Sequence, residues 1–345
     1  MRKYSSSSLF GGLIAALLVL PTTAPGADKP ASWKTLEGHT DSVYCVDASP
    51  DGKWFASGGF DQVVRVWDSR TGKQVRSLSG HTKMVLSIAF TPDSSNIVSS
   101  SLDNLVKVWP TQKPVIPKES VIPKGKPTPE QNFSHNYAGH QSQVYGVAFS
   151  PDAKLVASCG YDKSIKLWDL AAKREIRSIP VESKTDLAVY GVAFSLDGKS
   201  LLASYSDGLV RQFETETGKP QRQLAGAKGA LYSLSLQKQG TLIAAGGLDK
   251  AVYLWKAGDG QLERSLAGHD DDIYRVQFNP AGTRLLSLGY SGQIRVWDLS
   301  TGKPLLTAKL PALLFGGCYT SDGRQILAAA SDQKIYVVEL PSAAQ

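Results

Sequence analysis

Cysteine is scarce in this sequence of 345 residues, and its few copies cannot form a disulfide framework. The three cysteines, Cys45, Cys159 and Cys318, are odd in number and widely separated. Small disulfide-stabilised proteins carry even sets of cysteines at short spacings. We therefore expect these three residues to be buried free thiols.

Motifs for metals, haem, calcium and phosphate are also missing. The sequence has no Cys-x-x-Cys-His segment, no paired histidines on one predicted strand and no calcium-loop pattern. The pairs Gly58-Gly59 and Gly246-Gly247 precede tight turns and do not form a phosphate-binding loop. We therefore expect no cofactor and no metal site.

Charge of one sign is not concentrated anywhere in the chain. Lysine and arginine number 38 and aspartate and glutamate 31, which gives a formal net charge of +7 at pH 7. The basic residues are spread over the whole length instead of forming one run. The sequence therefore indicates no nucleic-acid partner.

No hydrophobic run in the sequence is long enough for a typical membrane span, and the longest one lies near the start. Residues 1–27 begin with Arg2 and Lys3, continue with about a dozen apolar positions from Leu9 to Leu20, and end in small residues. A membrane anchor is the alternative, but a span needs roughly 20 apolar residues. The pattern favours a secretory signal peptide, hence a periplasmic or extracellular protein without a membrane span in the mature chain.

Helix signals are nearly missing from the rest of the chain. Apolar runs of four to eight residues alternate with polar ones and end at Gly, Asp or Pro. This pattern predicts an all-β protein throughout.

One unit of sequence, residues 139–169, recurs along the chain. Counting from His140, Ser158 lies 18 residues on, Asp162 lies 22 on and Trp168 lies 28 on. Internal repeats of this length are typical of propellers and related arrays. The same intervals link His39, Ser57, Asp61 and Trp67; His81, Ser99, Asp103 and Trp109; His269, Ser287, Ser291 and Trp297; Thr185, Ala203, Asp207 and Phe213; Ala227, Ala245, Asp249 and Trp255; Leu310, Ala328, Asp332 and Val338.

With its Gly-His openings and Trp-Asp endings, the chain resembles the WD-repeat (transducin β-like) propeller family over roughly residues 33 to 340. The resemblance implies seven four-stranded antiparallel blades around a central channel. The domain is expected over residues 28–340, with residues 341–345 as a tail. The last repeat supplies only three strands, so residues 33–37 would form the outer strand of that blade and close the ring.

The recurring Ser, His and Asp residues suggest a hydrolase at first sight. A catalytic triad is a single exposed set, whereas this set repeats beside a Trp. The resemblance implies a hydrogen-bonded tetrad inside each blade. The intact sets are His39, Ser57, Asp61 and Trp67; His81, Ser99, Asp103 and Trp109; and His140, Ser158, Asp162 and Trp168.

A basic residue two positions before the Trp recurs in five repeats. Its aliphatic stem is expected to pack over a neighbouring strand while its charge reaches water or an acid. These residues are Arg65, Lys107, Lys166, Arg211 and Arg295.

A proline-rich insertion, residues 110–132, lengthens the second repeat. Proline favours extended polyproline II, so we expect a stiff exposed loop between the third and fourth strands of the second blade. It is either a solvated insertion or a docking segment.

Five residues after the His position, six of the seven repeats carry an aromatic residue, and the resemblance places this position at the channel mouth. These residues are Tyr44, Leu86, Tyr145, Tyr190, Tyr232, Tyr274 and Phe315, with Phe60, Tyr161 and Tyr290 beside them, before the hairpin-turn position. Tyr is enriched in binding surfaces because it combines a large apolar face with a hydroxyl group. The rings either bind a partner or plug the channel.

We therefore predict a non-catalytic exported scaffold that binds another protein or protein complex through these aromatic residues. A propeller that binds a peptide or a glycan is the alternative, and a propeller hydrolase a less favoured one. The protein is expected to be monomeric on its own.

Overall fold

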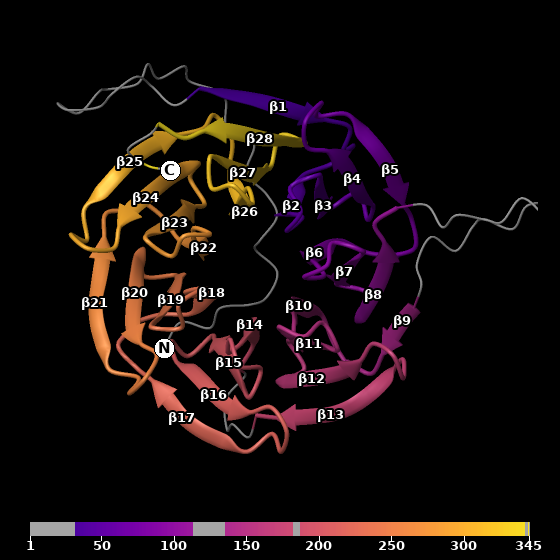
Figure 1. Cartoon of the computed structure of the whole chain (residues 1–345), viewed down its shortest axis with the longest axis vertical. Helices are drawn as coiled ribbons and strands as arrows, with labels where there is room; N and C mark the ends of the chain where they lie inside the picture. The colour runs from indigo at the N-terminus through magenta and orange to yellow at the C-terminus, as the bar shows by residue number, and fades with distance from the viewer. Residues whose placement is uncertain (1–31, 113–134, 182–186, 342–343, 345) are drawn as a thin grey trace, which may run out of the picture. The chain divides into compact units, whose positions relative to one another are not determined.

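The computed structural model describes residues 32–112, 135–181, 187–341 and 344. Within these ranges it is all-β, as predicted, and contains no α-helix. Seven four-stranded antiparallel sheets follow one another around a ring, each sheet forming one blade (Figure 1). The predicted signal peptide, most of the proline-rich insertion and most of the C-terminal tail lie outside the described residues.

Each blade begins with its strand nearest the channel and ends with its outermost strand (Figure 1). Blade one contains β2 (Val43–Ala48), β3 (Trp54–Gly59), β4 (Val64–Asp68) and β5 (Gln74–Leu78); blade two contains β6 (Val85–Phe90), β7 (Asn96–Ser101), β8 (Leu105–Pro110) and β9 (His135–Ala138); blade three contains β10 (Val144–Phe149), β11 (Leu155–Gly160), β12 (Ser164–Asp169) and β13 (Arg174–Pro180).

The remaining blades repeat this order. Blade four contains β14 (Val189–Phe194), β15 (Ser200–Tyr205), β16 (Val210–Glu214) and β17 (Pro220–Leu224); blade five contains β18 (Leu231–Leu236), β19 (Leu242–Gly247), β20 (Ala251–Lys256) and β21 (Leu262–Ala267). Blade six contains β22 (Ile273–Phe278), β23 (Arg284–Gly289), β24 (Gln293–Asp298) and β25 (Pro304–Lys309); blade seven contains β26 (Leu314–Tyr319), β27 (Gln325–Ala330), β28 (Lys334–Glu339) and β1 (Trp33–Glu37).

The hydrophobic core lies between neighbouring sheets. Trp67 of blade one, for example, packs with Ile335 and Val337 of blade seven. In the second and third strands of a blade, successive side chains point alternately toward the two neighbouring blades. These strands are therefore apolar on both faces. A blade is therefore stable only between two other blades.

The N-terminal strand closes the ring as the sequence predicts. β1 pairs antiparallel with β28, with Trp33 opposite Val338 and Leu36 opposite Ile335. Leu36 is buried in the cluster that contains Trp67. Because β1 and β28 pair with each other, neither strand leaves the edge between them unpaired.

The inner strands expose one backbone edge to the channel, and side chains of the preceding blade bind that edge. The Ser233 hydroxyl accepts from Val276 N–H at 3.1 Å, and Asp47 accepts from Phe90 N–H at 3.0 Å. Gln277 accepts from Tyr319 N–H at 2.7 Å in the same way. These bonds satisfy donors that the sheet leaves unpaired and link successive blades.

Candidate functional site

A β-bulge at the start of each inner strand positions the aromatic residues. In β2 the pairing passes from Val43 opposite Gly59 to Cys45 opposite Gly58, so Tyr44 has no partner residue in β3. A bulge re-aims the side chain of the extra residue away from the regular alternation of the strand. The seven bulged residues are Tyr44, Leu86, Tyr145, Tyr190, Tyr232, Tyr274 and Phe315.

The bulged aromatic residues form a continuous arc through six of the seven blades. Successive ring centroids lie 5.1 Å apart for Tyr145 and Tyr190, 5.3 Å for Tyr190 and Tyr232, 5.3 Å for Tyr232 and Tyr274, 6.2 Å for Tyr274 and Phe315, and 5.4 Å for Phe315 and Tyr44. These separations are typical of favourable aromatic pairs. Leu86 of blade two is buried and interrupts the arc.

Residues of the hairpin turns extend the arc outward. Phe60 lies 6.4 Å from Tyr44, and Tyr290 lies 5.3 Å from Tyr274, between ring centroids. Tyr161 is 50% exposed. We call the six bulged rings with Phe60, Tyr161 and Tyr290 the aromatic rim. Apart from the exposed Tyr161, its members are half-buried, so their rings contact one another while part of each stays accessible.

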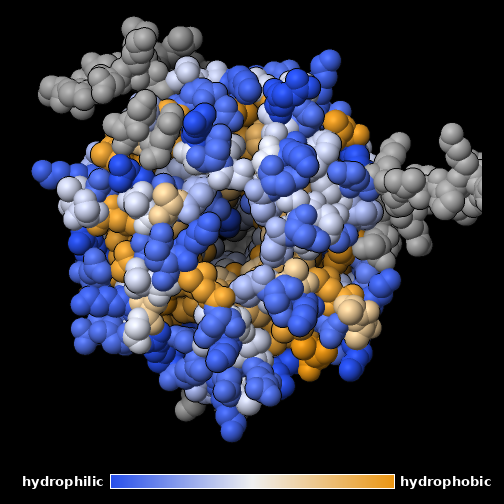
Figure 2. Space-filling view, viewed as in Figure 1, coloured by the Kyte–Doolittle hydropathy of each residue, from blue (hydrophilic) through white to orange (hydrophobic). Residues whose placement is uncertain are grey.

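Two apolar residues beside the aromatic rim were missed by the sequence analysis. Leu248 is 49% exposed and Leu313 is 38% exposed. Leu248 stands directly before Asp249, the position at which Phe60, Tyr161 and Tyr290 stand in other blades. Comparing that position in all seven repeats, instead of looking for aromatic residues alone, finds Leu248. Seen in the orientation of Figure 1, the ring is hollowed at its centre, with hydrophobic residues beside the hollow (Figure 2).

Burial raises the pKa of the five bulged tyrosines, so they stay protonated at neutral pH. Burial, followed by the charges of neighbouring Tyr290 and Asp272, raises the pKa of Tyr274 to about 12. Burial followed by the negative charge of Asp272 also raises the pKa of Tyr232. The hydroxyl group of Tyr145 donates to Gln143 at 2.8 Å. These five tyrosines therefore present neutral hydroxyl groups at pH 7 and are poor general bases.

The tetrad side chains of blades one to three lie within hydrogen-bond distance of one another. In blade one, His39 Nδ1 lies 2.9 Å from Asp61 Oδ2 and its Nε2 lies 2.7 Å from Ser57 Oγ. The Ser57 hydroxyl accepts from the Trp67 indole at 2.9 Å. Blades two and three repeat this geometry through His81, Ser99, Asp103, Trp109, His140, Ser158, Asp162 and Trp168.

The degraded blades hold their hairpin turns by another route. In blade four, Arg211 makes two bonds to Asp207, at 3.0 and 2.6 Å. In blades five and seven a tyrosine occupies the position two before the Trp, and its hydroxyl group donates to the turn carboxylate. These pairs are Tyr253 with Asp249 at 2.5 Å and Tyr336 with Asp332 at 2.7 Å.

The five basic residues at this position find polar partners. Arg65 binds Asp61 at 3.0 Å, Lys107 binds Asn136 at 3.0 Å and Lys166 binds Glu175 at 3.0 Å. Arg295 differs from Arg65 and Arg211 because it donates to the backbone carbonyl of Gly268. An acid is therefore the usual but not the universal partner.

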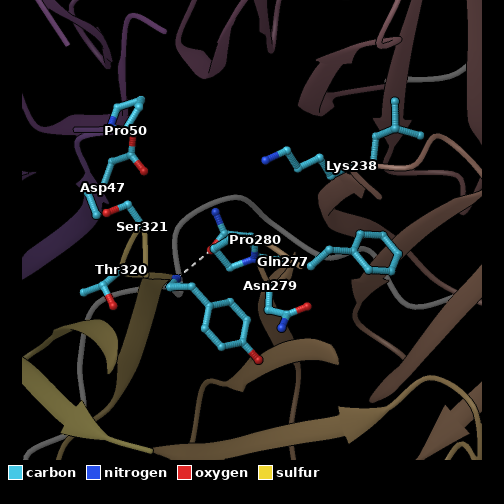
Figure 3. Close-up of a pocket in the computed structure, with 12 residues that line it drawn as sticks. Asp47, Pro50, Lys238, Gln277, Asn279, Pro280, Thr320 and Ser321 are labelled. Atoms are coloured by element: carbon cyan, nitrogen blue, oxygen red, sulfur yellow. Dashed lines mark hydrogen bonds between the residues drawn. The ribbon is translucent and has the colours of Figure 1, made fainter. Parts of the chain in front are cut away.

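The opposite ends of the inner strands surround a cavity of about 220 Å³ (Figure 3). Asp47 and Lys238 stand on opposite sides of it, with Gln277 and Pro280 between them (Figure 3). Burial raises the pKa of Asp47 to about 6 although Phe90 N–H and Arg275 lower it. This cavity is separate from the aromatic rim, which lies where the inner strands begin.

The cysteines are buried and unpaired, and burial raises the pKa of each thiol. Among the described residues no group of three or more His, Cys, Asp or Glu side chains is arranged to hold a metal ion. A search of the same residues finds no helix with the length and apolar character of a membrane span.

A family model of the WD domain, G-beta repeat, matches residues 31–68, 72–110, 131–169, 176–214, 218–256 and 260–298. The rice "Small ribosomal subunit protein RACK1z" is 27% identical over 183 residues, covering 52% of this chain and 36% of that protein. The Dictyostelium discoideum "Periodic tryptophan protein 2 homolog" is 40% identical over 80 residues, 23% of this chain and 8% of the relative. The Saccharomyces cerevisiae "COMPASS component SWD3" is 34% identical over 85 residues, 24% and 26% respectively. The chain thus spans little more than a third of these relatives at most.

Proposed function

The chain belongs to the WD40 family, and from that premise we propose that it is a non-catalytic scaffold whose aromatic rim binds another protein or protein complex. The observation that carries the proposal is the continuous aromatic arc at one mouth of the channel. Large, stiff aromatic residues lose little conformational entropy on binding and bury much apolar area. The exposed Tyr161, Leu248 and Leu313 enlarge this surface.

The names of two relatives support the proposal that the partner is a protein or a protein complex. The rice relative is named as a ribosomal subunit protein and the yeast relative as a COMPASS component, so both are parts of larger assemblies. A fold by itself does not dictate a partner. The partner of this chain is therefore sought by experiment.

The geometry of the tetrads supports a non-catalytic role. Ser57, Ser99 and Ser158 are fully buried, and each hydroxyl already accepts from a Trp indole. A serine nucleophile must reach its substrate and lie beside a free base. These serines therefore serve the fold.

Photo-crosslinking tests which face binds. A photoreactive phenylalanine analogue replaces Tyr161, a member of the aromatic rim, or Leu196, which is 48% exposed and follows the far end of β14. The two positions match in exposure and differ in face. Crosslinks from position 161 alone support the proposal, whereas equal crosslinks from both positions, or from 196 alone, contradict it.

Ring truncation separates binding from plugging. We expect the variant Tyr145→Ala, Tyr232→Ala, Tyr274→Ala to lose the crosslink formed at position 161 while remaining folded. If the rings serve only as a plug, the crosslink persists and the free energy of unfolding falls. The matched control is Leu196→Ala on the other face, which should change neither quantity.

We propose in addition that the protein is exported through residues 1–27. The basic start, the short apolar segment and the small residues after it support this. The test is expression of the full sequence in a Gram-negative host, with mass spectrometry of the product in each compartment. Periplasmic protein that begins near residue 28 supports export, whereas full-length cytoplasmic or membrane-bound protein contradicts it.

A further inference from the structure

A carboxylate at the hairpin turn collects hydrogen-bond donors in blades one to three. Asp61 Oδ2 lies 2.9 Å from His39 Nδ1 and accepts from Thr40 N–H at 3.2 Å and from the Arg65 guanidinium at 3.0 Å. Its Oδ1 accepts from Val63 N–H at 3.3 Å. The turn is therefore built around one negative charge.

Blade six keeps the donors but lacks the carboxylate, because Ser291 stands at the Asp position. His269 Nε2 still lies 2.6 Å from Ser287 Oγ, which accepts from Trp297 at 2.8 Å. At this turn, however, three of the described buried atoms have no hydrogen-bond partner: His269 Nδ1, Ser291 Oγ and Arg295 Nε. Arg65 Nε in blade one has none either, so His269 Nδ1 and Ser291 Oγ are the atoms that distinguish blade six. His269 is only 7% exposed, so its free nitrogen pays a desolvation cost.

Gln293 fills only part of the missing role. Its Oε1 accepts from Asp270 N–H at 3.3 Å, the bond that Thr40 makes to Asp61 in blade one. An amide oxygen carries no charge to balance Arg295. Burial, followed by the positive charge of Arg295, lowers the pKa of His269 to about 4. Asp270 and Gln293 oppose this shift in part. The turn of blade six therefore keeps its donors but lacks the turn carboxylate that accepts from them in blade one.

We propose that the position of the missing carboxylate in blade six binds a carboxylate that another molecule supplies. The donors would be His269 Nδ1, the Ser291 hydroxyl and the Arg295 guanidinium, with Gln293 moving aside. Charge-assisted hydrogen bonds of this kind are stronger than neutral ones. The carboxylate is either a free anion or an acidic group of a macromolecule. The inference does not depend on the proposed function.

The proposed carboxylate site lies beside the aromatic rim. Ser291 follows Tyr290 of the aromatic rim directly, so a carboxylate bound there lies at the edge of that surface. Asp270, Asp271 and Asp272 directly follow His269 and repel an anion. Direct hydrogen bonds must therefore supply the binding energy, and Asp271→Asn should tighten binding by removing part of the repulsion.

The first test measures thermal unfolding of the purified protein with increasing sodium formate at pH 7, against sodium chloride of equal ionic strength. We expect formate to raise the wild-type melting temperature in a saturable manner, because a ligand that binds only the folded state stabilises it. Ser291→Asp supplies the carboxylate within the blade and should abolish the formate effect. Asp61→Ser opens the same position in blade one and should add a second formate-dependent rise. Equal formate effects in wild type and Ser291→Asp would overturn the proposal.

The second test needs no variant to fold. In ¹⁵N-histidine-labelled wild-type protein, formate but not chloride should shift the His269 Nδ1 resonance, and an unchanged resonance would refute the site. Two further ligands distinguish the sources. N-acetyl-aspartyl amide offers a side-chain carboxylate, and N-acetyl-glycine offers a terminal one. A shift with either at lower concentration than formate indicates a macromolecular acidic group, whereas a shift with formate alone indicates a small free anion.

Discussion

Single residues stabilise this protein by forming hydrogen bonds with polar groups that burial would otherwise leave unpaired. Each tetrad serine accepts from a tryptophan and lies beside a histidine, so it satisfies two neighbours at once. Removing a shared partner costs more than the one bond, since both neighbours stay buried. The blades with alanine at this position lack the histidine and hold the turn with Arg211, Tyr253 or Tyr336 instead.

We predict that Ser158→Ala lowers the free energy of unfolding by about 2 kcal/mol, because it strands Trp168 Nε1 and His140 Nε2. Urea unfolding measures the difference. The control is Ser178→Ala, an exposed serine of the same blade whose one donor, Lys166, keeps Glu175 as a partner; it should change stability by less than about 0.5 kcal/mol. Similar losses for the two variants would argue against the shared-partner account.

Asp47 should make the free energy of unfolding fall as the pH rises, which is the opposite of the effect of a carboxylate with a lowered pKa. Burial raises its pKa from 3.8 to about 6, so the folded state binds this proton more tightly than the unfolded state. Its contribution to stability is therefore greatest below pH 4 and is lost as the pH rises through 6. Asp47→Asn should stabilise the protein by about 1–2 kcal/mol at pH 8 and have little effect at pH 4.

Urea unfolding of wild type and Asp47→Asn at both pH values measures this effect. Asp51→Asn is the control of opposite sign. Slight burial raises the pKa of Asp51, but hydrogen bonds from Ser49 and Lys53 outweigh it and lower the pKa. Its contribution is present above pH 4 and lost below. An Asp47→Asn effect that is equal at pH 4 and pH 8 would contradict the assignment.

At the scale of elements, the blade is the unit of pattern but not of stability. Clusters of buried residues join Trp67 to Ile335 across two blades and Ala244 to Ile273 across two others. β1 matters most among the strands because it brings the start of the chain to the last blade. Its one buried side chain, Leu36, belongs to the cluster that contains Trp67 and Ile335.

We predict that Leu36→Ala destabilises the protein by about 2–4 kcal/mol, through lost apolar contact and the cavity left behind. The amides of β28 should exchange with solvent faster than those of β12, since β28 loses its outer partner first. Hydrogen exchange with mass spectrometry tests this. Lys34→Ala, at an exposed position of the same strand, is the control. Equal exchange in β28 and β12 after Leu36→Ala would show that β1 does not protect the last blade.

At the scale of the whole molecule, closure removes the sheet faces and edges that an open array would expose. The first and last strands of the ring meet at this closure, where Glu339 N–H donates to the Ser32 carbonyl at 2.9 Å. The chain could therefore begin at another blade without opening the ring.

Deleting residues 310–345 should expose the faces of blades one and six and cause oligomerisation, measured by light scattering after size exclusion. A circular permutant that joins residue 341 to residue 32 and begins at Lys173 retains all seven blades. It should stay monomeric because β13 then closes blade three as β1 closes blade seven. A monomeric deletion variant, or an aggregating permutant, would refute the role of closure.

The sequence alone determined the number of blades, the tetrad sets and the closing strand, because each depends on spacing or on a local residue pattern. The aromatic residues were also visible in the sequence, at one position of each repeat. Only the tertiary structure decided that this position is a β-bulge and that the rings of six blades touch, since residues some forty positions apart meet there. It also decided which degraded blades compensate and that the turn of blade six leaves His269 Nδ1 without a hydrogen-bond partner. Those outcomes depend on where side chains converge across neighbouring sheets, and the pattern along one strand does not contain that information.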